Sequence, residues 1–126
     1  MIDLTAVFKN KYFIRMAVFI FLGLIFIQPF FSMQNFSPAF DEVFHLPGGY
    51  SYLTTGSMLE LSHPPLGRIF AALPLLFLKP KTVATADYNI FGHNFLFKNN
   101  ADRLLFWGRL PIIFLSVLLG FFVFKF

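Results

Sequence analysis

A long stretch without charge dominates this chain. No Asp, Glu, Lys or Arg occurs from Met16 to Phe40, and the stretch ends at the adjacent carboxylates Asp41 and Glu42. A helix of about 20 apolar residues crosses the roughly 30 Å hydrocarbon core of a bilayer. Ionisable groups beside such a segment are costly in free energy and usually serve a function. The pattern predicts a transmembrane helix over residues 12–31, with acidic chemistry at the membrane surface after it.

The composition agrees with a membrane environment. Of the 126 residues, 57% are hydrophobic and only 13% are charged, whereas about a quarter of a soluble domain is charged. We therefore expect an all-α membrane protein that contacts membrane lipid. The net charge of +4 is spread over several segments, so no nucleic-acid partner is expected. The chain has no cysteine, which excludes disulfides and thiolate metal sites.

The basic residues near the start predict the orientation. Lys9, Lys11 and Arg15 flank the first helix, and such residues concentrate on the cytoplasmic side. Residues 1–11 are thus expected in the cytoplasm of a bacterial or archaeal cell, with the helix in its inner membrane. A signal peptide has a similar basic start, but no small-x-small cleavage site follows this apolar run, so a retained helix is favoured.

A second transmembrane helix is expected over residues 104–124. Arg109 lies near its start, where a long side chain can extend to the interface, and Pro111 is tolerated there. Residues 32–103 would then form an exoplasmic loop between the two helices. Because the sequence stops two residues after the second helix, we expect a truncated chain, the N-terminal part of a longer protein.

The loop has its own expected organisation. Its first part, 41–55, is interrupted by Pro47-Gly48-Gly49, which predicts a break. Residues 65–78 start with proline and are apolar but too short to span, so they predict an interfacial helix with a bend at Pro74. Residues 79–100 are mixed in composition and are expected to form a loop.

Several polar residues of the loop are candidates for chemistry. Asp41 and Glu42 either act as an acid–base group or simply cap a helix N-terminus. Glu42 and His45 share a helical face, so with His63 they form an alternative divalent-metal site. Hydrogen-bonded interface residues are the more common outcome for such a set. His93 has no evident partner in the sequence and is expected at the surface.

The sequence His63-Pro64-Pro65-Leu66-Gly67-Arg68 combines a rigid turn, a helix start and a cation. A helix N-terminus next to an arginine can bind an anion, and a lipid phosphate is the anion expected at this depth. Arg68 as an ordinary interfacial anchor is an equally good interpretation.

Several short motifs along the chain occur in an order and spacing that is also found in a known protein family. They are Asp41-Glu42-x-x-His45-x-x-x-Gly49-Tyr50-x-Tyr52-Leu53-x-x-Gly56, His63-Pro64-Pro65-Leu66, Ala72-Leu73-Pro74-Leu75, Phe91-Gly92, Asp102-Arg103-Leu104-Leu105 and Arg109-Leu110-Pro111. Together they resemble the first outer loop of family 39-like glycosyltransferases, the polytopic membrane enzymes related to protein O-mannosyltransferases. The resemblance covers nearly the whole chain.

The resemblance implies a fold and an activity. It implies the N-terminal part of a C-type glycosyltransferase fold, which uses a polyprenyl-phosphate sugar donor and a hydroxyl acceptor at the outer membrane face. Asp41 would be the catalytic base, with Glu42 in support. From charge and position, we expect His63, Arg68 and Arg109 to bind substrate, the arginines through the donor phosphate. The rival interpretation is a non-enzymatic membrane subunit or assembly factor with two helices.

Overall fold

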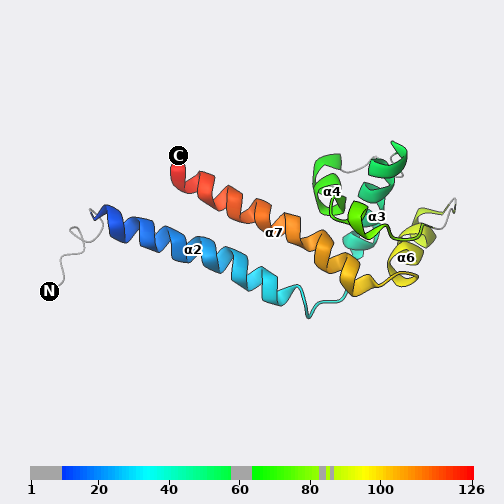
Figure 1. Cartoon of the computed structure of the whole chain (residues 1–126), viewed down its shortest axis with the longest axis horizontal. Helices are drawn as coiled ribbons and strands as arrows, with labels where there is room; N and C mark the ends of the chain where they lie inside the picture. The colour runs from blue at the N-terminus through cyan, green and yellow to red at the C-terminus, as the bar shows by residue number, and fades with distance from the viewer. Residues whose placement is uncertain (1–9, 58–63, 83–84, 86) are drawn as a thin grey trace.

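The computed structural model describes residues 10–57, 64–82, 85 and 87–126 (Figure 1). Within these ranges the chain is helical and contains no strand, which confirms the prediction of an all-α chain. The helices are α2 (Lys11–Ser32), α3 (Phe40–Thr55), α4 (Pro65–Ala72), α5 (Leu75–Leu78), α6 (Tyr88–Phe97) and α7 (Ala101–Lys125).

The two long helices, α2 and α7, form an antiparallel pair. Figure 1 shows them side by side, with the shorter helices gathered where α2 ends and α7 begins. Aromatic side chains join the pair: the rings of Phe26 and Phe114 have centroids 5.5 Å apart. Farther from the short helices, Gly120 of α7 lets Leu22 and Ile25 of α2 approach closely.

Both long helices meet the physical requirement for crossing a membrane. With 22 and 25 residues, α2 and α7 extend about 33 and 37 Å. Both are apolar enough to span, as the sequence predicts. No residue of α2 is buried, and large apolar side chains such as Phe19, 81% exposed, project from it. A surface of this kind suits lipid or other helices better than water.

Helix α3 is continuous, so the break expected at Pro47-Gly48-Gly49 is wrong. Proline lacks an N–H group, so the Val43 carbonyl one turn earlier loses its helical partner. That carbonyl lies against Gly92 of α6, so closely that a Cβ on Gly92 would clash with it. The proline therefore costs α3 one hydrogen bond, and the helix continues because this region is buried against its neighbours.

The apolar segment after Pro65 forms two helices, α4 and α5. They are separated at Leu73–Pro74, where the sequence predicts a bend, and Pro74 precedes the first residue of α5. Helix α4 packs against α3 and α7, and α5 also contacts α7. The segment thus lies along the start of one long helix and does not form a third long span.

Helix α6 corrects the expectation of a loop over residues 79–100. Its N-terminus is capped by Asp87, whose carboxylate accepts the N–H groups of Asn89 and Ile90 at 2.8 and 3.2 Å. Glycine at position 92 lowers helix propensity, but it permits the close contact between α6 and α3. Tertiary packing therefore outweighs local propensity here.

The core lies among the short helices and the first turns of α7. The Tyr50 and Phe95 rings have centroids 5.4 Å apart, and the Tyr88 hydroxyl donates to the Phe44 carbonyl at 2.8 Å. These contacts join α3 to α6. The buried apolar cluster consists of Leu46, Tyr50, Ala72, Leu75, Phe95, Leu96, Leu104 and Leu105.

Candidate functional site

A cavity of about 860 Å³ lies where the long helices meet the short ones. Its wall is formed by the last turn of α2, the segment 33–39, and parts of α3, α4 and α7. Most of the lining is apolar. The cavity brings together five candidate residues from distant parts of the sequence: Asp41, Glu42, His45, Arg68 and Arg109. The sixth candidate, His63, lies outside the described residues.

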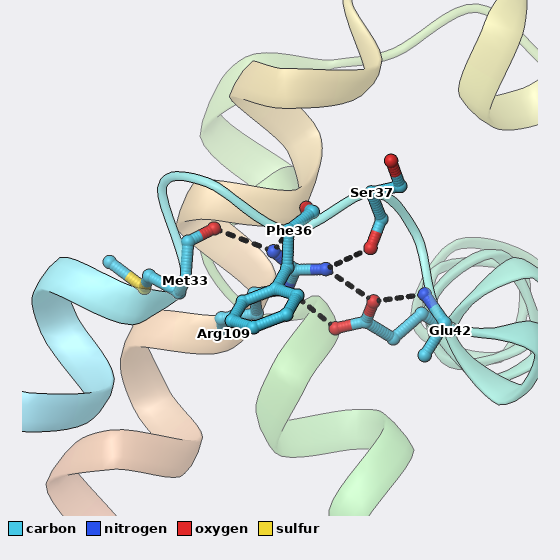
Figure 2. A network of polar contacts seen from close by, with 6 residues as sticks. Met33, Phe36, Ser37, Glu42 and Arg109 are labelled. Atoms are coloured by element: carbon cyan, nitrogen blue, oxygen red, sulfur yellow. Dashed lines mark hydrogen bonds and ion pairs between the residues drawn. The ribbon is translucent and has the colours of Figure 1, made fainter.

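Arg109 is the centre of the polar contacts at this cavity. Its Nε and Nη2 donate to the two carboxylate oxygens of Glu42, each at 2.6 Å, in a bidentate ion pair. Nη1 donates to the carbonyls of Met33 at 2.7 Å and Phe36 at 3.1 Å, and Nη2 also donates to that of Ser37 at 3.1 Å (Figure 2). One side chain therefore joins α7 to the end of α2 and the start of α3.

This geometry gives Arg109 a different use from the one expected. A guanidinium has five N–H groups, and the five contacts of Arg109 match that number. As arranged, no N–H of Arg109 remains to bind a donor phosphate. Met33 is the C-cap of α2, where carbonyls lack helical partners and the helix dipole is negative. Arg109 satisfies these carbonyls and organises the wall of the cavity.

Glu42 has two structural contacts. Besides its ion pair with Arg109, its Oε2 accepts the N–H of Ala39 at 2.8 Å, which caps the start of α3. Burial by itself would raise the pKa of Glu42. The hydrogen bonds from Arg109 and the Ala39 backbone, together with the positive charge of Arg109, outweigh burial and lower that pKa. Glu42 is therefore held as a carboxylate.

Asp41 differs from its neighbour. It is exposed, lies in the first turn of α3, and lines the cavity. Within the described part of the chain, no hydrogen bond or ion pair involves its carboxylate. The capping interaction considered for this pair is made by Glu42, which leaves Asp41 accessible to a molecule in the cavity. His45, four residues later, lies on the same face of α3 and also lines the cavity.

Arg68 lies in the first turn and a half of α4 and is 6% exposed. Its backbone carbonyl is so close to Gly49 of α3 that a Cβ there would clash. Its Nη1 lies near Gly48, 3.9 Å from where a Cβ of that residue would be. Gly49 thus allows α3 and α4 to meet at backbone distance, and this contact fixes Arg68 in the cavity wall.

Two further expectations concern histidines. Among the residues that the structure describes, no group of three or more His, Cys, Asp or Glu side chains could hold a metal ion. Glu42, one member of the alternative metal set, binds Arg109. His93 is exposed, as expected, but on α6 and not in a loop, and its ring packs against Phe97 with centroids 4.5 Å apart.

The backbone carbonyls of Met33, Phe36 and Ser37 are parts of the site that sequence reasoning missed. Residue types do not reveal which carbonyls are left without partners, because that depends on where α2 ends. The one local signal is Pro38, which disfavours a helical conformation at Ser37.

Comparison with protein-family models, with curated proteins and with solved structures finds no match to this chain.

Proposed function

We propose that the chain is the N-terminal part of an integral-membrane glycosyltransferase. It would move a sugar from a polyprenyl-phosphate donor to an acceptor hydroxyl at the outer membrane face. The observation that carries the proposal is the accessible Asp41 carboxylate at a large, mostly apolar cavity that also contains the arginine Arg68. The cavity lies at one end of two helices apolar enough to span a membrane.

The cavity residues suit the parts of such a reaction. Asp41 accepts the proton of the acceptor hydroxyl as its oxygen bonds to the anomeric carbon. The bond from that carbon to the phosphate oxygen breaks, and polyprenyl phosphate leaves. Arg68 stabilises the negative charge that develops on the phosphate. The apolar lining accommodates the first isoprene units. Glu42 and Arg109 support Asp41 by fixing the start of α3.

The test uses the protein expressed from its complete gene, with Asp41→Asn as the decisive variant. Loss of a positioned base lowers the rate by about 10²–10⁴-fold. Transfer of labelled sugar from a polyprenyl-phosphate donor to membrane acceptors measures this rate. We expect normal accumulation in the membrane and normal donor binding, with almost no transfer.

Asp87→Asn is the matched control, because it makes the same chemical change at the N-cap of α6, and Asn caps as well as Asp. It should leave transfer unchanged. Near-normal sugar transfer by the Asp41→Asn variant would show that Asp41 is not the catalytic base. If the wild-type protein transfers no sugar, and further membrane proteins copurify with it, the two-helix subunit is the better interpretation.

A further inference from the structure

Four exposed cations lie in three segments near the start of α7, which both α5 and α6 contact. Lys79 and Lys81 follow α5, Lys98 ends α6, and Arg103 lies in the first turn of α7. All four side chains are exposed. We call this set the basic surface; Asp102 is the carboxylate next to it.

The side chain of Asn99 brings these segments together. Its Oδ1 accepts the N–H of Lys81, and its Nδ2 donates to the carbonyl of the same residue, both at 2.9 Å. Nδ2 also donates to the carbonyl of Phe95 at 2.8 Å. The segment after α5 is therefore attached to the turn between α6 and α7, so the basic surface is a feature of the fold.

An apolar stripe adjoins the basic surface. Leu66, Leu73 and Phe77 are 65%, 40% and 90% exposed. Leu66 lies on α4, Phe77 lies on α5, and Leu73 lies at the junction between the two helices. The stripe ends next to Lys79, which follows α5 directly. A row of exposed apolar side chains beside cations is typical of a segment lying in the interface of a bilayer.

The position of the basic surface along α7 agrees with a location at the membrane interface. Arg103 immediately precedes the apolar part of α7, and α4 and α5 pack against that helix. If α7 spans the bilayer, the basic surface lies at headgroup level and the apolar stripe lies beside the acyl chains.

We propose that the basic surface binds the headgroups of anionic membrane lipids, with Leu66, Leu73 and Phe77 inserted among the acyl chains. Each Lys or Arg close to an anionic surface strengthens binding about fivefold. Cations in excess over carboxylates, next to an inserted apolar stripe, favour lipid over an acidic protein as the partner. The inference is independent of the proposed glycosyltransferase activity, since it involves no cavity residue.

The single tryptophan of the chain provides the measurement. Trp107 is one helical turn after Arg103, on the same side of α7, and is 39% exposed. The chain is reconstituted in bilayers that contain brominated phosphatidylglycerol or brominated phosphatidylcholine, which quench nearby tryptophan. We expect the anionic lipid to be preferred at Trp107 by about fivefold or more, and the preference to weaken as salt increases.

In the combined variant Lys81→Gln, Lys98→Gln, Arg103→Gln, the two brominated lipids should quench the Trp107 fluorescence equally. The matched control, Lys11→Gln with Arg15→Gln at the other end of α2, should keep the wild-type preference. Arg103→Gln alone decides the question if the combined variant loses its helical circular dichroism. Equal quenching of wild type by the two lipids, or a preference that survives these substitutions, would overturn the proposal.

Discussion

At the scale of single residues, Arg109 shows how one largely buried cation can connect three parts of a chain that lie far apart in the sequence. Its acceptors are three carbonyls beyond α2 and the carboxylate at the start of α3. A lysine could supply the charge but not the planar fork that contacts both carboxylate oxygens. The side chain is 15% exposed, so solvent competes little for these contacts.

The Glu42–Arg109 pair predicts acid-sensitive stability. The pKa of Glu42 is lowered in the folded chain, so its contribution is complete above the unfolded glutamate pKa. That contribution is lost as the pH falls through the lower, folded pKa. At neutral pH, we expect Glu42→Gln to destabilise the chain by about 2 kcal/mol, the typical worth of a hydrogen bond to a charged group. Thermal unfolding in detergent at several pH values measures the difference.

The difference between wild type and Glu42→Gln should shrink towards zero in acid. Arg109→Lys serves as the companion variant, because it keeps the charge and loses the bidentate geometry; it should give an intermediate loss. A wild-type advantage that does not vary with pH would show that the ion pair does not stabilise the fold.

At the scale of elements, the short helices are positioned by backbone contact at glycines. Gly49 of α3 meets the Arg68 carbonyl of α4, and Gly92 of α6 meets the Val43 carbonyl of α3. Any side chain at either position would separate two helices. Since α3 and α4 both line the cavity, their spacing sets its shape.

Gly49→Ala should therefore destabilise the chain strongly, by about 3 kcal/mol, since the clash is with backbone and not with a flexible side chain. Gly67→Ala is the matched control on α4: a Cβ there meets nothing within 4 Å. It should stabilise by up to about 1 kcal/mol through helix propensity. Thermal unfolding followed by circular dichroism tests both. Equal stability of Gly49→Ala and wild type would contradict the contact between α3 and α4.

The same elements explain what the sequence could predict. The long uncharged run and the apolar segment after Leu104 indicate two long helices, because the bilayer sets their length and polarity. The continuity of α3 and the presence of α6 depend on contacts between distant segments, which override Pro47 and Gly92. Asp87 was a local signal for α6, as an N-cap before an apolar stretch.

The candidate site was predictable to a similar extent. Asp41, Glu42 and Arg68 stand out as polar residues beside apolar segments, and the fold brings them to one cavity. The separate roles of Asp41 and Glu42 were not predictable from the sequence. That Glu42 binds an arginine 67 positions later, and leaves Asp41 accessible, follows from where α2 ends and α7 begins.

At the scale of the whole molecule, the antiparallel pair determines on which side the site lies. The end of α2 and the start of α7 are together, and the cavity and short helices lie there (Figure 1). If both long helices span, the cavity and the short helices lie towards one side of the membrane, and the start of α2 and the end of α7 lie on the other. The orientation then decides which solvent the cavity faces.

We expect the N-terminus in the cytoplasm and the cavity outside. Lys9, Lys11 and Arg15 precede or begin the first apolar run, and flanking cations of this kind set orientation, whereas a connecting segment this long translocates largely regardless of its charge. The chain has no cysteine, so single cysteines introduced at Ser57, Thr85 and Thr5 can be labelled without background. In intact cells, a membrane-impermeant thiol reagent should label the first two positions, and Thr5→Cys should react only after lysis. Labelling of Thr5→Cys alone in intact cells would show that the orientation is the opposite one. The cavity would then face the cytoplasm, where an outer-face sugar transfer could not occur.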